Sequence, residues 1–140
     1  MNIKDVLAIS ASGMNAQRAR TEAIASNLAN ANVTRTAEGG PYKRRIPVFE
    51  GHSLDPFGDA LGSAMSTVEV SDVEQVEQFR KEYDPQHPDA DEDGYVLRPD
   101  IDIMTEMVDL MEAVRGYEAN ANVVDVTKEM VSAALRIGKG

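Results

Sequence analysis

The sequence predicts a mainly α fold in which long N- and C-terminal helices pair as a coiled coil around a central insertion of irregular and short β structure. Three observations support this prediction. Apolar residues recur at alternating steps of four and three through 103–137. The same spacing runs through 3–31, and turn signals break the helical pattern between the two segments. We therefore divide the chain into 1–32, 33–100 and 101–140, with the first and last parts forming one helical domain.

The N-terminal segment is expected to form a helix over 3–31. Eight alanines favour this helix, although Gly13 costs about 1 kcal/mol relative to alanine in a helix interior. Alone, such a helix would be marginally stable in water. Asn27 and Asn30, together with Asn120 of the C-terminal helix, are expected to fix helix register, as buried asparagine does in coiled coils. The residues of the N-terminal helix expected at an assembly interface are Leu7, Met14, Ile24, Asn27, Leu28 and Asn30.

The middle of the chain is expected to be extended or irregular. Residues 64–82 fit one or two strands, but 73–80 fit a helix equally well. Gly39-Gly40-Pro41 indicates a turn before the first extended run. The remaining expectations are extended runs at 42–49 and 95–97, a loop at 55–63, and a rigid acidic loop at 83–94.

The C-terminal segment is expected to form a helix over 103–137, with Asp100 or Asp102 as its N-cap and Glu106 favourably placed in its first turn. This helix would be about 50 Å long, whereas a compact globule of this chain length has a diameter of roughly 35–40 Å. The helix therefore needs a long partner or an assembly. The apolar seam runs through Ile103, Met107, Leu110, Val114, Tyr117, Ala121, Val124, Lys128, Val131 and Leu135, and Lys128 is its one polar position. The expected interface residues of this helix are Met107, Leu110, Val114, Tyr117, Asn120, Val124, Lys128, Val131 and Leu135.

Both expected helices also carry apolar residues away from the seam. Val6, Ile9 and Ala16 lie there on the first helix, and Met104, Met111 and Val126 lie there on the second. Two helices cannot bury two-sided apolar surfaces against only each other. The pattern therefore indicates that helices of further chains complete the packing.

The composition excludes several classes of protein. The 140 residues include no cysteine, so the chain has no disulfide, thiolate metal site or cysteine nucleophile. No apolar run has the length of a signal peptide or of a membrane span, so we expect neither. The formal net charge is −10, and residues 55–93 alone hold two Lys/Arg and twelve Asp/Glu. Such an acidic middle argues against a nucleic-acid partner.

The acidic segment 89–94 matches the first half of an EF-hand calcium loop, D-x-D-x-D-G, with Asp89, Asp91 and Asp93 as candidate metal ligands. Two features argue against this site. Pro88 stands where an EF-hand has its incoming helix, and the loop ends on an aspartate in place of the bidentate glutamate. An acidic turn ordered by proline, Asx bonds and glycine is therefore favoured, and a calcium-binding module is the alternative function.

No catalytic or cofactor site is expected. The two histidines, His52 and His87, have no second soft ligand beside them for a catalytic metal. Nucleophile-elbow, Walker and dinucleotide-binding motifs are absent from the sequence. Carboxylates are abundant, as in any acidic loop, so their presence does not indicate acid–base catalysis. We therefore expect a protein that is not an enzyme.

Several stretches of the chain resemble the axial rod proteins of the bacterial flagellum. Residues 12–20 and 24–34 are similar to the N-terminal motif that flagellar rod and hook proteins share. Residues 34–36 combined with 39–43 are typical of the C-type proximal rod proteins within this family. The other matching stretches are 83–96, 106–111, 115–120 and 135–139.

This resemblance implies a structural subunit that packs helically with copies of itself and with other flagellar rod proteins, forming a tube around an axial channel. It implies a location in the basal-body rod, which spans the periplasm. It also implies export by the flagellar type III apparatus without a cleaved signal peptide. The further partners that it implies are the membrane-ring base and the export components at the base of the rod.

Overall fold

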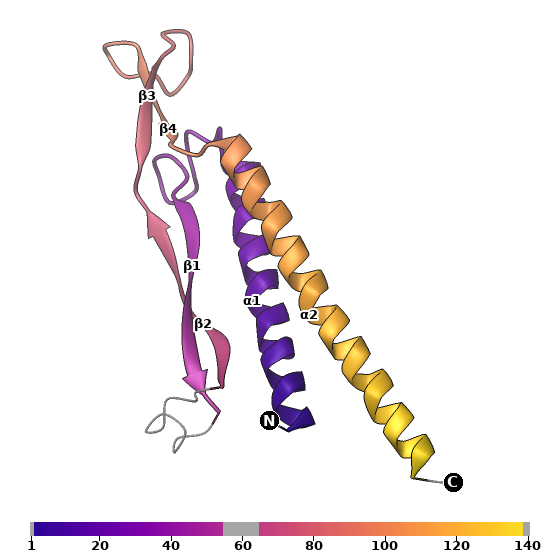
Figure 1. The fold of residues 1–140 in the computed structure, drawn as a ribbon. Coiled ribbons are helices and arrows are strands. Elements are labelled where there is room, and N and C mark those ends of the chain that lie inside the picture. Colours follow the sequence, from indigo (N-terminus) through magenta and orange to yellow (C-terminus); the bar gives the residue numbers. More distant parts are fainter. Residues whose placement is uncertain (1, 55–64, 139–140) are drawn as a thin grey trace.

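The computed structural model describes residues 2–54 and 65–138. The elements follow one another as α1 (Ile3–Asn30), β1 (Arg44–Ser53), β2 (Ser66–Val76), β3 (Phe79–Tyr83), β4 (Tyr95–Pro99) and α2 (Ile103–Ile137). Helix α1 lies between α2 on one side and the β1–β2 pair on the other (Figure 1). Two long terminal helices around a small antiparallel β insertion confirm the predicted fold class. The loop expected at 55–63 lies outside the described residues.

Helix α1 begins at a capping box. The Asn2 side chain accepts a hydrogen bond from the backbone N–H of Lys4, and the Asp5 carboxylate accepts one from the N–H of Asn2 at 2.7 Å. These contacts satisfy backbone donors that the first helical turn leaves without partners. The helix ends at Asn30, one residue before the predicted end.

Helix α2 spans Ile103–Ile137, as predicted. Its N-cap is Asp102, which decides between the two expected candidates. The Asp102 carboxylate accepts hydrogen bonds from the backbone N–H of Met104 at 3.0 Å and from the hydroxyl of Thr105 at 2.8 Å. The Thr105 bond and then the Met104 bond favour the ionised form, so the pKa of Asp102 lies below its usual value.

The four strands form two antiparallel pairs. In the first pair Arg44 faces Val76 and Ser53 faces Ser66, with a bulge between Val48 and Phe49. In the second, β3 pairs with β4 along its full length. Residues 73–80 are therefore strand on both sides of a short break and not helix. The physical reason is the cross-strand pairing with β1 and β4, which a periodicity count over one segment does not include.

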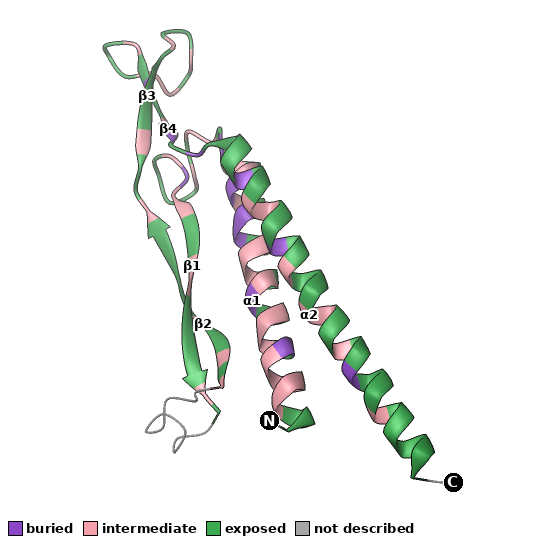
Figure 2. Ribbon diagram, viewed as in Figure 1, coloured by how far each residue is buried: buried purple, intermediate pink, exposed green. Residues whose placement is uncertain are grey.

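The core is small and lies where the two helices and β1 meet. Ala31, Tyr42 and Ile101 form a buried cluster with Val33 packed against it. Buried residues follow α1 and recur at only three positions of α2, which is mostly exposed (Figure 2). Among the described residues, no helix combines the length and apolar character that crossing a bilayer requires.

Candidate assembly interface

Small and polar residues form much of the contact between the two helices. The buried residues on α2 are Glu106, Ala113 and Thr127, none of which is a large apolar residue. Two glycines bring the backbones close. A methyl group at Gly13 would lie 2.9 Å from Nδ2 of Asn120, and one at Gly116 would lie 3.1 Å from Cδ of Gln17. Each helix therefore offers a glycine notch that an amide side chain of the other helix fills.

These contacts fix one antiparallel register. Gly13 lies opposite Asn120, Gln17 lies opposite Gly116, and Asn27 bonds Glu106 at the far end of the pair. Extending this register places the first residue of α1 opposite Met130. The last turns of α2, residues 131–137, therefore extend past the beginning of α1 and have no helical partner within the described chain.

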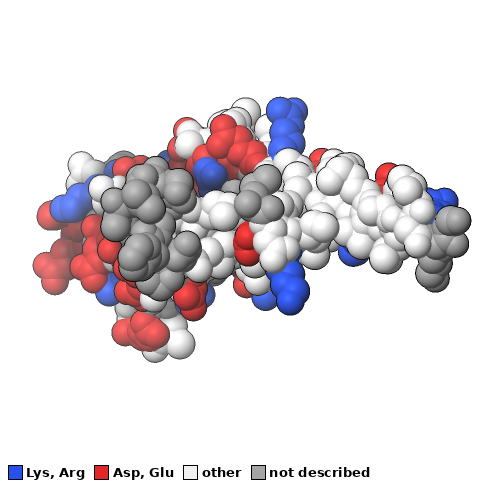
Figure 3. All heavy atoms as spheres, turned by 60° about the horizontal axis from the view of Figure 1, so that its bottom comes forward, with Lys and Arg blue, Asp and Glu red and all other residues white. Residues whose placement is uncertain are grey.

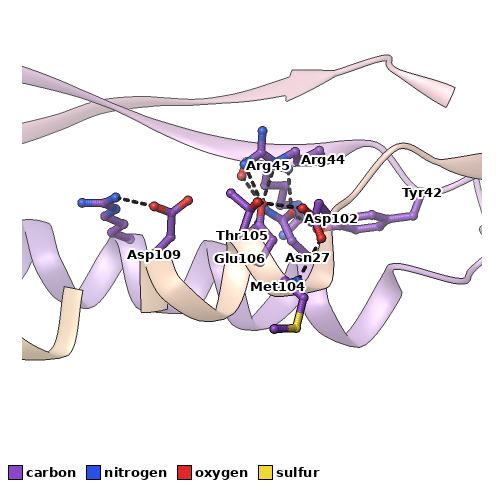
Figure 4. A network of polar contacts seen from close by, with 10 residues as sticks. Asn27, Tyr42, Arg44, Arg45, Asp102, Met104, Thr105, Glu106 and Asp109 are labelled. Carbon is purple, nitrogen blue, oxygen red and sulfur yellow. Dashed lines mark hydrogen bonds and ion pairs between the residues drawn. The ribbon is translucent and has the colours of Figure 1, made fainter. Parts of the chain in front are cut away.

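Asn27 is at the centre of a buried polar junction that joins α1, β1 and α2 (Figure 4). Its Oδ1 accepts hydrogen bonds from the N–H of Arg45 at 2.8 Å and from the hydroxyl of Tyr42 at 3.1 Å. Its Nδ2 donates to the carbonyl of Arg45 at 3.0 Å and to Oε2 of Glu106 at 3.3 Å. The side chain is 1% exposed, and its bonds to Tyr42 and Glu106 are buried, whereas the two to Arg45 are partly buried.

Glu106 carries the buried charge of this junction. It is 2% exposed, and Nε of Arg44 donates to its Oε1 at 2.7 Å. One turn along α2, Asp109 accepts a hydrogen bond from Arg20 of α1 at 3.1 Å. Burying an unpaired carboxylate would cost several kcal/mol, and these cationic and amide partners offset that cost. The junction therefore requires α1, β1 and α2 together.

An ion pair of Lys43 and Glu77 lies on the surface beside the start of β1. The side-chain hydrogen bond to Glu77 raises the pKa of Lys43, and the same bond lowers the pKa of Glu77. This contact ties the start of β1 to the end of β2. Its solvent exposure limits what it adds to stability.

The structure divides the predicted interface residues into three groups. Ile24 and Asn27 are buried. Leu7, Met14, Leu28, Asn30, Leu110, Asn120, Val124 and Val131 are half-buried. Met107, Val114, Tyr117, Lys128 and Leu135 are exposed.

The exposed group has a physical reason. The buried residues of α2 are Glu106, Ala113 and Thr127, and each precedes a position of the apolar seam by one residue. The helices therefore meet along a small and polar face beside the seam, because small residues permit the closer approach. Among the three asparagines expected to fix register, Asn27 bonds other elements. Asn30 donates to its own helix at Ser26, and Asn120 donates to Gly116. Lys128 pairs on the surface with Asp125.

Four large apolar residues form a continuous exposed row on the first half of α2. We name this row the α2 stripe, and it consists of Met104, Met107, Met111 and Val114. Their exposed fractions run from 43% to 71%. Figure 3 shows acidic side chains gathered at one end of the molecule. The far end of α2 forms an arm at the opposite end, and this arm is largely uncharged on the face shown. Apolar rows of this kind mark protein–protein contacts.

The acidic loop uses its carboxylates to build its own conformation. Asp89 accepts a hydrogen bond from the hydroxyl of Thr34 at 2.8 Å. Asp91 accepts bonds from the backbone N–H groups of Asp93 at 3.1 Å and Tyr95 at 2.7 Å. Within 2–54 and 65–138, no group of three or more His, Asp or Glu side chains could hold a metal ion. Nothing here supports the calcium-binding alternative.

The sequence interpretation missed the roles of Glu106, Arg44 and the two notch glycines. In the sequence, Glu106 is explained by its favourable place in the first turn of the helix, which gives no reason to expect it in a buried junction. A search for apolar periodicity gives no weight to small or polar faces. One signal was available. A glycine precedes an amide residue by four positions in both helices, at Gly13 and Gln17 and again at Gly116 and Asn120.

Two family profiles match the helical ends of the chain. The profile described as "Flagella basal body rod protein" matches residues 7–35. The profile described as "Flagellar basal body rod FlgEFG protein C-terminal" matches residues 92–137. These matches include most of α1 and all of α2, together with β4.

Relatives match nearly the whole chain. It is 44% identical to the flagellar basal-body rod protein FlgC of Aquifex aeolicus, with 93% of this chain and 92% of the relative covered. It is 40% identical to FlgC of Bacillus subtilis, with 95% and 96% covered. For FlgC of Borreliella burgdorferi the identity is 34%, with both chains fully covered. The chain therefore belongs to the FlgC family of flagellar basal-body rod proteins.

Proposed function

We propose that this chain is a structural subunit of the flagellar basal-body rod and assembles there with other rod proteins. It is a structural protein and not an enzyme. The observation that carries the proposal is the α2 stripe, because four large apolar side chains in a row need a covering partner. The names of the relatives supply the assembly in which that partner is found.

The finer architecture is also part of the proposal. The paired helices pack with helices of neighbouring subunits in a helical, non-closing array. That array forms the drive shaft and the wall of the export channel. In this arrangement α1 and α2 act as one helical domain, and the strands are an insertion at its side. The exposed predicted residues Met107, Val114 and Tyr117 are the first candidates for contacts with neighbours.

The route to the assembly belongs to the proposal as well. We propose export by the flagellar type III apparatus without a cleaved signal peptide, and contacts with the membrane-ring base and the export components at the rod base. The helical contact supports this route. Its small and polar residues bury little apolar surface, so the chain is easily unfolded for transit and gains its full stability on assembly.

The test uses a strain that lacks this gene and is complemented with variants. Met107→Asp and Val114→Asp are expected to keep the chain soluble and folded, because both side chains are about half exposed. They are expected to remove it from purified basal bodies and to abolish swimming. Asn122→Asp adds the same charge at an exposed polar position of α2. It is expected to change neither the presence of the chain in basal bodies nor swimming. Swimming cells with normal rods for both stripe variants would contradict the proposal.

A further inference from the structure

A cleft lies where β4, the acidic loop and the loop after α1 meet. Its volume is about 480 Å³, within the roughly 300–1,000 Å³ range of ligand pockets. The residues that line it belong to the loop after α1 (34–35 and 39–41), to the acidic loop (88–91) and to β4 (95–97). None of the residues of the α2 stripe is among them. The cleft is therefore a second candidate binding site, separate from the stripe.

The hydrogen bonds of the β3–β4 pair show which backbone groups of β4 point away from β3. The N–H of Asp84 donates to the carbonyl of Gly94 at 3.0 Å, and the N–H of Asp100 donates to the carbonyl of Gln78 at 2.9 Å. Both bonds continue the register of the pair, in which hydrogen-bonded and non-hydrogen-bonded positions alternate. Positions 95, 97 and 99 therefore direct their backbone groups outward.

Leu97 holds an open donor and acceptor on this outward edge. Tyr95 donates its N–H to the Asp91 carboxylate at 2.7 Å, and its carbonyl accepts from the Asp91 N–H at 2.8 Å. Asp91 also lines the cleft, so the outward edge of β4 borders it. Pro99 has no N–H to donate. No hydrogen bond joins the N–H or the carbonyl of Leu97 to another residue within 2–54 and 65–138.

The chain closes the corresponding pair of groups on β1. Arg45 also directs its N–H and its carbonyl away from the neighbouring strand, and the side chain of Asn27 bonds both. The described residues provide no such group at Leu97, where the cleft leaves room for one. One residue of an extended peptide carries the matching acceptor and donor, as in strand addition at sheet edges.

The charge around the cleft indicates the kind of peptide that fits. Residues 84–93 hold five Asp/Glu and no Lys or Arg. Asp89 pairs with Arg35 at 3.7 Å. Glu92 and Asp93 are exposed, and neither makes an ion pair with another residue that the structure describes. A segment that carries Lys or Arg therefore complements the charge beside the cleft.

We propose that the cleft binds an extended, basic peptide segment of another protein, and that one residue of this segment exchanges both backbone hydrogen bonds with Leu97. The proposal goes beyond the proposed function, because it concerns a surface outside the α2 stripe and is tested on the purified chain. If no peptide binds, the place of the chain in the rod is unaffected. If the chain is absent from basal bodies, the cleft still binds the peptide.

The test selects peptides from a random heptapeptide library displayed on phage, with the purified full chain as bait. The selected peptides are expected to combine Lys or Arg with β-branched residues. Leu97→Pro removes the outward N–H at an edge position of the kind that Pro99 already occupies, and it is expected to weaken binding of these peptides about tenfold. Leu97→Val keeps the N–H and is the matched control, with affinity expected to stay within about twofold.

Amide exchange in the chain without substitutions gives a second readout. The N–H of Leu97 is expected to exchange fast in the free chain and about tenfold more slowly when a selected peptide is bound, as measured by NMR. The amide of Tyr95 already bonds Asp91 and is expected to exchange slowly in both states. Equal exchange of the Leu97 amide with and without bound peptide would overturn the proposed contact.

Removing two charges tests the preference for a basic segment. Glu92→Gln combined with Asp93→Asn is expected to weaken binding of the selected peptides about fivefold, and added salt is expected to act in the same direction. Three results of the selection would each overturn the proposal: no binder, binders that are acidic, or binders that bind the Leu97→Pro chain as tightly as the original one.

Discussion

The side-chain amide of Asn27 bonds both backbone polar groups of Arg45, accepting from its N–H at 2.8 Å and donating to its carbonyl at 3.0 Å. Asn27, which lies on α1, thus makes the pair of backbone hydrogen bonds to Arg45 that a neighbouring strand would make with β1. Its second N–H donates to Glu106 of α2. One side chain therefore fixes the position of a strand and of a second helix relative to α1.

Asn27→Asp keeps the shape of the side chain and tests this arrangement. It removes both donated hydrogen bonds and places a second carboxylate beside the buried Glu106. We expect the free energy of unfolding to fall by about 2–4 kcal/mol, measured by urea denaturation of the purified chain. Asn122→Asp, at an exposed position of α2, is expected to change it little. Equal urea midpoints for the two variants would contradict the role of Asn27.

Gly13→Ala tests the notch that Asn120 fills. Alanine improves helix propensity by about 1 kcal/mol, but its methyl group would lie 2.9 Å from Nδ2 of Asn120. We expect the steric cost to cancel or exceed the gain in the single variant. In combination with Asn120→Ala the clash is absent, so a double-mutant cycle is expected to give a coupling energy of about 1 kcal/mol. Additive effects would show that the notch does not constrain the helices.

Gln17→Met is expected to stabilise the chain. Oε1 of Gln17 is buried at the other notch and has no hydrogen-bond partner among the residues that the structure describes. A buried acceptor without a partner costs about 1–3 kcal/mol, and methionine has a similar length without that acceptor. We expect a gain of about 1 kcal/mol in the free energy of unfolding, read from thermal and urea denaturation. A loss of stability would indicate that the amide has a partner in solution.

The stability of the first turn of α2 is expected to depend on pH, because Asp102 caps it. Its folded-state pKa is lowered by the hydroxyl of Thr105 and by the backbone N–H of Met104. The contribution of the cap to stability is therefore fully present above the unfolded-state pKa of about 3.9, and it is lost as the pH falls through the lower folded-state pKa. An NMR titration of the Met104 amide is expected to show this midpoint below 3.9. Asp102→Asn caps without titrating and should lack it.

Hydrogen exchange along α2 is expected to follow the register of the helix pair. Amides around Ala113, which is fully buried, are expected to exchange slowest. Amides in 131–137 extend past α1 in the isolated chain, and a helical end without a partner is marginally stable. They are expected to exchange nearly as fast as an unfolded peptide, and to become protected in assembled rods. Uniform protection along α2 in the monomer would contradict the register.

Local signals in the sequence determined the helices and the family. The bounds of α2 follow from a long apolar period and a capping aspartate, and those of α1 from its own period and its alanines. These signals act within a few residues of chain, so they can be read without knowing any partner. The flagellar motifs are likewise contiguous, and the relatives confirm the family that they indicated.

The tertiary structure decided which face of each helix is used within the chain. The apolar seam predicts contacts at Met107 and Val114, yet the helices meet through glycine notches and polar residues and leave those side chains exposed. Periodicity reports that a face is apolar but not what covers it. The junction of Asn27 and Glu106 joins residues 79 positions apart. Only the folded chain brings their complementary hydrogen-bonding groups together and removes them from water.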